Sequence, residues 1–333
     1  MSTDVALRGS RTIARLGVPT PLIVPSFSSR GFPDVGPMLA LLRDDLYGVC
    51  LISAFDVAHQ HVPIALPDIA DVLVLDSGVY ETTPVLVAPD RHAPPPTGAH
   101  WSRADYRATL ATLTAATNAL VVSFDHYGPL DQQVALAQED FAQAASAATD
   151  LLVKPAEPTR LLDIGTVLQH AEALTPFDVL GVTEKELGDS LLARCVALRQ
   201  LRRGLAGVDL DCPIHVFGAV TPGVMLAYLM SGADLFDGLN WLRYDYSQPG
   251  LTCLAEPTVD DPLWDRPDCE RFLDRWRRNL RLLHKLQEAM RCYAEGGSPE
   301  QLHSLWPSQG VAAAAMRTVT AAAAADRATE GER

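Results

Sequence analysis

Short apolar runs recur along the chain, and most of the stretches between them have a helical pattern. Eight of these runs are typical of buried strands, and they lie at 21–27, 48–56, 71–81, 119–128, 150–157, 177–186, 214–219 and 234–241. Between them, Ser102 and Asp105 form a capping-box pattern that starts one helix, and another helix is expected from Asp131 to about Thr149. Eight strands that alternate with helices indicate a parallel sheet closed into a (β/α)8 TIM barrel.

The alternative fold with the same alternation is a doubly wound open sheet. That fold often carries a glycine-rich phosphate-binding turn after a strand, and none of the eight runs is followed by one. We therefore expect an α/β barrel with a C-terminal helical extension. Its predicted parts are a flexible tail at 1–18, the barrel at 19–250, a helical extension packed on the barrel at 251–310, and an alanine-rich helix that becomes a disordered tail at 311–333.

Three of the predicted strands end in an aspartate, namely Asp76, Asp125 and Asp237. In a (β/α)8 barrel the C-terminal ends of the strands meet at one mouth, where catalytic residues lie. The most complete pattern leads to Asp237. A predicted strand is followed by a helix with Thr221 as N-cap and Pro222 at its first position, and then by a second short strand that carries Asp237. An ionised carboxylate is costly to bury without partners, so these acids indicate a functional site.

Three carboxylates at one mouth suit two kinds of chemistry. They are typical ligands of a hard metal ion, and they are equally typical of an acid/base and nucleophile set. A hard metal needs further oxygen ligands, whereas Lys154 at the tip of the fifth strand is placed to pair with one of the acids. His59 and His61 have the spacing of a metal-binding pair but no visible third ligand. No metal is expected.

A proline-rich segment separates the third strand from the helix that begins at Ser102. Its centre, APPPTGAH at 93–100, is too rich in proline to form a regular element. A loop of this length beside a barrel mouth is typical of a lid, and a passive surface loop is the alternative.

The charge balance limits the partners that the surface can attract. The 333 residues carry a formal net charge of −14, which opposes broad electrostatic attachment to nucleic acid. The exception is the segment 266–291, which contains eight Arg or Lys residues and four Asp or Glu residues. Its apolar residues recur at helical spacing, so it predicts an amphipathic helix whose basic face is either solvated or contacts phosphates.

The apolar runs are all short compared with the roughly 20 residues that span a bilayer. The N-terminal segment MSTDVALRGSRT also lacks the apolar core of a signal peptide. The six cysteines are scattered without short paired spacings, which is typical of reduced thiols. We expect a cytoplasmic protein with no membrane partner.

Five short motifs occur together around these strand ends. They are LDSG ending at Gly78, SFDHY around Asp125, LGV at 180–182, HVFG at 215–218 and GADLFDG at 232–238. Over roughly residues 20–245 the combination resembles the tRNA-guanine transglycosylase superfamily. Members of that superfamily are zinc-bearing (β/α)8 barrels that exchange a guanine in tRNA for a 7-deazaguanine base, as in queuosine formation, and relatives insert such bases into DNA. The resemblance implies a glycosyltransferase that forms a homodimer and binds a purine or 7-deazapurine base and a nucleic acid.

Matching positions imply roles for the acids and for two aromatic residues. Asp237 corresponds to the nucleophile that attacks the ribose anomeric carbon and holds the sugar covalently while the bases are exchanged. Asp76 corresponds to the general acid/base, and Asp125 to the residue that hydrogen-bonds the purine edge. Tyr80 and Phe217 match the side chains that sandwich the base, for which core packing is the structural alternative.

Five further positions match substrate-binding positions of the superfamily or replace them. Ser77 belongs to the LDSG motif, and the backbone of Leu180 and Gly181 matches the segment that reads the 7-substituent. Arg243 matches an arginine just beyond the nucleophile, with a surface ion pair as the alternative. Lys154 stands in place of a glutamine on the fifth strand.

The chain also departs from the superfamily pattern. The zinc motif CxCxxC with a later His is missing, because Cys253, Cys269 and Cys292 are too far apart to form it. We therefore expect neither zinc nor another cofactor. The residues that follow LDSG and those that follow Asp237 also differ, which leaves open two alternatives: a barrel that acts on a free nucleoside or nucleotide, and a non-catalytic barrel that binds deazapurines.

Overall fold

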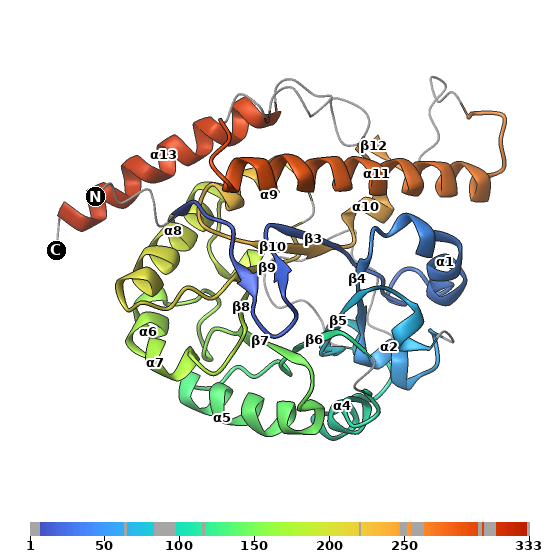
Figure 1. Cartoon of the computed structure of the whole chain (residues 1–333), viewed down its shortest axis with the longest axis horizontal. Helices are drawn as coiled ribbons and strands as arrows, with labels where there is room; N and C mark the ends of the chain where they lie inside the picture. The colour runs from blue at the N-terminus through green and yellow to red at the C-terminus, as the bar shows by residue number, and fades with distance from the viewer. Residues whose placement is uncertain are drawn as a thin grey trace.

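The computed structural model describes residues 7–62, 65–82, 98–114, 117–219, 221–246, 252–254, 263–298, 302 and 311–331. Within these residues, eight parallel strands form one sheet that curls into a barrel with helices outside it (Figure 1). In sheet order the strands are β3 (Leu22–Pro25), β10 (Leu235–Gly238), β9 (Ile214–Phe217), β8 (Val179–Thr183), β7 (Ala148–Val153), β6 (Ala119–Val122), β5 (Val72–Asp76) and β4 (Val49–Ser53). All eight predicted strands and the (β/α)8 fold are confirmed.

Helices cover the outside of the sheet between successive strands. They are α1 (Val35–Leu42), α2 (Ala54–Ala58), α4 (Arg103–Leu110), α5 (Leu130–Phe141), α6 (Ile164–Gln169), α7 (Ala171–Leu174), α8 (Leu191–Gly207) and α9 (Pro222–Leu229). The capping box of Ser102 and Asp105 is present at the start of α4. The helix predicted to reach Thr149 was too long, because Thr149 belongs to β7 and pairs with Val121. Sheet pairing overrides the helical propensity of the alanines there.

The pleat of each strand decides which side chains face the barrel interior. In β7, Leu151 and Val153 pack toward the helices, whereas Leu152 packs inside the barrel with Val24 and Val74. The alternation places Asp150 on the interior side as well. Polar residues on that side can reach the site at the strand ends.

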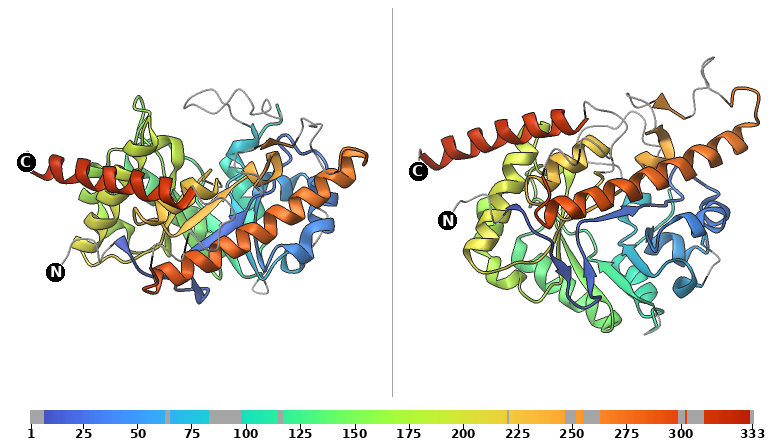
Figure 2. Two further views of the ribbon diagram at one scale, coloured as in Figure 1. Left: turned by 90° about the horizontal axis from the view of Figure 1, so that it is seen from above. Right: turned by 45° about the horizontal axis from the view of Figure 1, so that its top comes forward.

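The barrel closes between β3 and β4 with help from a long helix. The two strands are bridged near their ends, where the Phe27 backbone N–H donates to the Leu51 carbonyl at 2.9 Å. Below that bridge the Ile23 N–H donates instead to the side-chain oxygen of Gln287 at 2.6 Å. Gln287 belongs to α11 (Asp268–Ala294), which runs along this side of the barrel (Figures 1 and 2). The predicted helical extension therefore contributes directly to the barrel wall.

The N-terminal segment is folded against the barrel. Strands β1 (Thr12–Ile13) and β2 (Val18–Pro19) form an antiparallel hairpin, which lies across the centre of the barrel in Figure 1. Ile13 is fully buried and packs with the interior side chains of the barrel, among them Leu22 and Leu235. The prediction of a flexible tail at 1–18 is thus wrong for residues 7–18, because burial of Ile13 fixes the hairpin in place.

The alanine-rich C-terminal segment is a helix, α13 (Val311–Gly331), which packs on α8 and α9. Its Asp326 is 1% exposed and pairs with Arg203 at 2.6 Å and with Arg199 at 3.5 Å. The predicted disordered end is therefore wrong through Gly331, because this ion pair anchors the last turns of the helix. None of the helices in the described part of the chain is long and apolar enough to cross a membrane.

The basic residues of α11 are largely engaged in ion pairs within the chain. Arg275 pairs with Asp245 at 2.7 Å and is 4% exposed, which places its guanidinium inside the protein. On the outer side, Arg277 pairs with Asp45 at 3.1 Å, and Arg278 pairs with Asp274 at 2.9 Å. These contacts favour the structural interpretation of the basic face over a phosphate-binding one.

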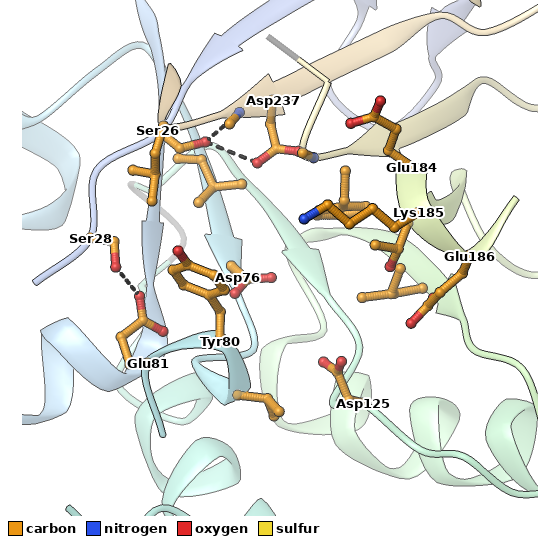
Figure 3. Close-up of a pocket in the computed structure, with 18 of the residues that line it drawn as sticks. Ser26, Ser28, Asp76, Tyr80, Glu81, Asp125, Glu184, Lys185, Glu186 and Asp237 are labelled. Atoms are coloured by element: carbon orange, nitrogen blue, oxygen red, sulfur yellow. Dashed lines mark hydrogen bonds between the residues drawn. The ribbon is translucent and has the colours of Figure 1, made fainter. Parts of the chain in front are cut away.

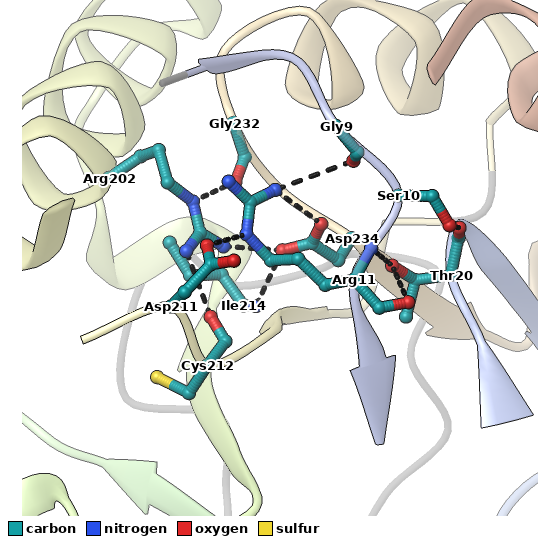
Figure 4. A network of polar contacts seen from close by, with 10 residues as sticks. All are labelled: Gly9, Ser10, Arg11, Thr20, Arg202, Asp211, Cys212, Ile214, Gly232 and Asp234. Carbon is teal, nitrogen blue, oxygen red and sulfur yellow. Dashed lines mark hydrogen bonds and ion pairs between the residues drawn. The ribbon is translucent and has the colours of Figure 1, made fainter. Parts of the chain in front are cut away.

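A buried ion cluster lies at the N-terminal end of the barrel (Figure 4). Arg202 of α8 is 0% exposed, pairs with Asp234 and donates to the carbonyls of Gly232 at 2.9 Å and Cys212 at 2.8 Å. The same aspartate pairs with Arg11 at 3.0 Å, just before the hairpin. The cluster thus joins α8, the start of β10 and the N-terminal segment.

Candidate active site

A pocket of about 320 Å³ opens at the C-terminal ends of the strands (Figure 3). Its lining includes seven of the residues predicted from the sequence, namely Asp76, Tyr80, Asp125, Lys154, Phe217, Asp237 and Arg243. These residues lie at the ends of five strands or in the segments that follow them, spread over almost 170 positions, and the barrel brings them to one mouth. The pocket is at the small end of the volumes typical of ligand sites, and it suits a single compact molecule.

Asp237, on β10, is held by three neighbours. Its Oδ2 accepts a hydrogen bond from the Ser26 hydroxyl at 2.9 Å, and its Oδ1 accepts one from the Gly218 N–H at 3.0 Å. On the same side, Nε2 of His215 lies 3.6 Å from Oδ1. Hydrogen bonds of this kind favour the ionised carboxylate. The side chain is thus held in a fixed orientation, and it lines the pocket.

Asp76 ends β5 and faces the same pocket. Gly78 follows with a positive φ of 85°, which turns the chain sharply into the short helix α3 (Val79–Thr82). Burial raises the pKa of Asp76 to about 7, and the charges of Asp125 and Asp237 contribute to the same shift. A carboxyl group with this pKa can donate and accept a proton near neutral pH.

Asp125 belongs to a cluster built around a buried lysine. Its Oδ1 accepts a hydrogen bond from the Ser77 hydroxyl at 2.9 Å, and its Oδ2 lies 3.1 Å from Nζ of Lys154. The same Nζ lies 3.1 Å from Glu186 and donates to the Thr183 hydroxyl at 3.0 Å. These three contacts use the three N–H groups of the ammonium. Lys154 therefore holds the two carboxylates in place, and their oxygens can accept hydrogen bonds from a ligand in the pocket.

Glu81 adds another carboxyl group to the pocket wall. It is 1% exposed, and its Oε1 accepts a hydrogen bond from the Ser28 hydroxyl at 2.6 Å. Burial raises the pKa of Glu81 to about 8, with a contribution from the nearby charges of Asp56 and Asp76. Glu81 is therefore largely protonated at neutral pH.

The two aromatic residues line the pocket as predicted. Phe217 is 9% exposed and lies against the ring of His215, with 3.9 Å between the ring centroids. The ring of Tyr80 has the Arg30 guanidinium over it at 4.6 Å. Each ring is therefore supported by a neighbouring side chain, and both rings line the pocket, where a flat ligand can stack on them.

The positions predicted to read a base substituent through their backbone lie elsewhere. Leu180 is 1% exposed and packs outward against the helices, and neither it nor Gly181 is part of the pocket lining. Both lie inside β8, where their backbones pair with Leu151 and Leu152 of β7. The strand presents its end to the pocket instead, at Thr183 and at the turn that follows it.

Gly181 has a packing role. A Cβ on this residue would lie 2.7 Å from Oδ1 of Asp150 and 2.8 Å from a ring carbon of Phe217. We expect Gly181→Ala to lower the free energy of unfolding by about 1–3 kcal/mol, because a core side chain must move. Urea unfolding of the variant measures this change.

The matched control is Gly207→Ala. Gly207 ends α8, and a Cβ there meets no atom within 4 Å. This substitution is expected to leave stability unchanged or to raise it by up to about 1 kcal/mol, because alanine favours the helix. Equal effects of the two variants would contradict the packing role of Gly181.

Several pocket residues did not stand out in the sequence. Ser26, Glu186 and Lys185 line the pocket, and Figure 3 shows the Lys185 side chain extending into it. Behind Asp237 lie His215 and Asp150, each 0% exposed. One sequence signal could have found these two residues, because each is a polar residue within a largely apolar strand. His215 lies in IHVF, and Asp150 lies in ATDLLV.

The remaining site predictions concern metals and the proline-rich loop. Among the described residues, no group of three or more His, Cys, Asp or Glu side chains is arranged to hold a metal ion. Nδ1 of His61 contacts Asp56 at 2.9 Å, and Nδ1 of His59 contacts the Phe55 carbonyl at 2.9 Å. Most of the loop predicted as a lid, residues 83–97, lies outside the described residues.

No protein-family model matches the chain, and a search of curated proteins finds no match. The geometry of the site therefore has to indicate its chemistry. Its elements are a hydrogen-bonded carboxylate, a carboxyl group that titrates near neutral pH, two supported aromatic rings and fixed hydrogen-bond acceptors. This set suits nucleophilic displacement on a small molecule that carries a flat, polar ring system.

Proposed function

We propose that this barrel is a base-exchange transglycosylase that replaces guanine by a 7-deazaguanine-type base, as the resemblance to the tRNA-guanine transglycosylases suggests. The observation that carries the proposal is the meeting of Asp237 and Asp76 in one pocket. Asp237 accepts hydrogen bonds from Ser26 and Gly218, whereas the pKa of Asp76 is raised by burial to about 7. Two carboxyl groups with such different environments suit a nucleophile and a general acid/base.

The proposed reaction has two displacements at the sugar. In the first, a carboxylate oxygen of Asp237 bonds to the anomeric carbon, and the bond from that carbon to the base nitrogen breaks. The electron pair of this bond stays on the base, which receives a proton from Asp76. In the second, a nitrogen of the incoming base attacks the anomeric carbon, the ester bond to Asp237 breaks, and Asp76 takes the proton of that nitrogen. Two displacements retain the configuration of the sugar.

The rest of the pocket suits recognition of the base. Tyr80 and Phe217 offer aromatic faces, and flat heterocycles stack on such faces. Asp125 and Glu186, both pinned by Lys154, offer carboxylate oxygens to the N–H groups along a purine edge. A pocket of about 320 Å³ holds one nucleoside unit, so a polymer would insert a single extruded residue.

Base exchange can be measured directly. The protein is incubated with radiolabelled guanine or a labelled 7-deazaguanine and, in separate reactions, with tRNA, double-stranded DNA or free guanosine and deoxyguanosine. Incorporation of label into one of these acceptors supports the proposal and identifies the substrate. Lack of incorporation into all of them, together with lack of base release, would overturn it.

A second candidate substrate is a free nucleoside or nucleotide. It is favoured by the ion pairs that occupy the arginines of α11 and by the net charge of −14, because a polymer site normally draws on several phosphate contacts. Strong, salt-sensitive retention on tRNA or DNA would count against this candidate. Turnover of guanosine with no polymer exchange would favour it.

The role of Asp76 predicts a pH dependence. Release of the first base needs the protonated carboxyl group, and its pKa is about 7. Single-turnover base release is therefore expected to be fastest below pH 7 and to fall about tenfold per pH unit well above it. In Asp76→Asn, release is expected to be slow, without this decline. A flat wild-type profile between pH 6 and pH 8.5 would contradict the assignment.

A further inference from the structure

A buried histidine lies directly behind Asp237, between it and a second carboxylate. His215 on β9 is 0% exposed, and its Nδ1 lies 2.7 Å from Oδ2 of Asp150, which is also 0% exposed. Its Nε2 lies 3.6 Å from Oδ1 of Asp237 and has no hydrogen-bond partner. The three side chains thus form a row inside the barrel, and the row ends at the pocket.

The surroundings of His215 leave it little freedom to turn. One ring face lies against Phe217, with 3.9 Å between the centroids. On β8, Gly181 pairs with His215 and offers no side chain, and a Cβ there would displace Asp150 or Phe217. The glycine therefore provides the space in which the histidine and the aspartate meet.

The carboxylates on either side of the ring favour its doubly protonated form. A neutral imidazole that donates from Nδ1 to Asp150 would turn the lone pair of Nε2 toward an oxygen of Asp237, which is repulsive. A ring with both nitrogens protonated instead directs an N–H toward each carboxylate. Burial lowers the pKa of His215, but the hydrogen bond and the charge of Asp150 outweigh this effect and, with Asp237, raise it to about 9.

We propose that His215, held by Asp150, is a positioning residue that keeps Asp237 ionised and engages its Oδ1, so that Oδ2 is the attacking oxygen. The proposal rests on the proposed function. Oδ1 faces two donors, the Gly218 N–H and the His215 ring, whereas Oδ2 accepts a single hydrogen bond from Ser26. Oδ2 thus keeps a lone pair for the bond to the anomeric carbon.

The arrangement differs from a Ser–His–Asp triad, although both contain a carboxylate, an imidazole and a nucleophile. In the triad the imidazole removes a proton from the nucleophile. Here the nucleophile has no proton to lose, and the ring acts as a fixed cation. Its largest effect falls on the second displacement, where the ester bond breaks and the electron pair returns to Asp237. A preoriented cation beside the departing carboxylate stabilises this step.

The first test measures the charge of Asp237 without any turnover. A water-soluble carbodiimide with glycinamide modifies protonated carboxyl groups, and peptide mass spectrometry reports the rate at Asp237. In His215→Phe we expect modification at pH 6 to be about tenfold faster than in the wild type, because loss of a neighbouring cation disfavours the ionised carboxylate. An unchanged rate would overturn the proposal.

The second test measures base exchange. His215→Phe keeps a ring against Phe217, and we expect it to lower kcat by about 100-fold, the effect of losing one preoriented donor, with KM for the free base within twofold of the wild type. A rise in KM without a fall in kcat would overturn the proposal. If the wild type exchanges no base at all, the proposed function fails, and the carbodiimide rate still decides whether His215 keeps Asp237 ionised.

Asp150→Asn provides an independent test. The substitution is isosteric and preserves the packing, so this variant can be measured even if His215→Phe does not fold. The carboxylates of Asp150 and Asp237 are the charged groups that face His215, and loss of one lowers its pKa. Above the decline near pH 7 that Asp76 imposes on base release, exchange by the wild type should show a second, steeper decline as the pH rises through about 9, and this second decline should move to lower pH in Asp150→Asn. An unmoved profile would overturn the proposal.

The matched control is His284→Phe on α11. His284 is also a stacked histidine beside a carboxylate, 3.9 Å from the Tyr47 ring and 3.4 Å from Glu288, but it lies on the outside of the barrel. This variant is expected to retain the wild-type exchange rate, pH profile and Asp237 modification rate.

Discussion

Asp237→Asn is expected to abolish base exchange, with a loss in kcat of about 10⁴-fold or more, as found when a covalent nucleophile is removed. The amide is nearly isosteric with the carboxylate and can still accept the hydrogen bond from Ser26. It is a poor nucleophile, however, so the bond to the anomeric carbon does not form. Exchange is measured with labelled base, and the covalent sugar adduct is sought by mass spectrometry of the intact protein.

The matched control for this variant is Asp178→Asn. Asp178 precedes β8 at the opposite end of the barrel, where it accepts hydrogen bonds from the backbone and hydroxyl of Thr149. Its substitution is expected to reduce stability slightly and to leave exchange intact. Wild-type exchange rates in Asp237→Asn, or a sugar adduct on a residue other than Asp237, would contradict the assignment of the nucleophile.

Arg202→Met is expected to give the largest loss of stability, a fall of about 3–5 kcal/mol in the free energy of unfolding. Methionine approximates the length of the arginine stem but removes the charge and all the donors. Asp234 would keep only Arg11 as an ion-pair partner at 3.0 Å, and the carbonyls of Gly232 and Cys212 would lose a buried donor. A buried charge that loses its partner costs more than the pair contributed.

Equilibrium unfolding in urea measures this loss. Arg15→Met provides the control, because Arg15 is about half exposed and its contact with Asp178 is long, at 3.5 Å. Exposed pairs contribute little, so the control is expected to change stability by less than about 1 kcal/mol. A similar small change in Arg202→Met would show that the buried cluster does not hold the end of the barrel together.

The periodic features of the fold could be predicted from the sequence. A short run such as ALVV, rich in β-branched residues, is typical of a strand buried on both faces, so the strands could be predicted without knowledge of their partners. The acids that follow such runs were equally visible, and Asp76, Asp125 and Asp237 do meet in one pocket. Their common location follows from the parallel direction of the strands alone.

Features that depend on distant partners could not be predicted in this way. The hairpin around Ile13 has strands of two residues, too short for a periodic pattern, and the interior of the barrel stabilises it. Arg11 and Arg202 meet at Asp234 although 191 positions separate the two arginines. The packing role of Gly181 could not be predicted, because it arises from Asp150 and Phe217 on neighbouring strands.

The hairpin at the N-terminal end also bears on the order of events in the proposed reaction. Because Ile13 fills the interior at that end, the pocket is a well that opens at the strand ends. The departing base therefore has to leave by the route through which its replacement enters. With room for one nucleoside unit, the two bases occupy the well in strict alternation. During the interval the sugar stays bound to Asp237, and among the described residues the walls of the well are what shields this bond from water.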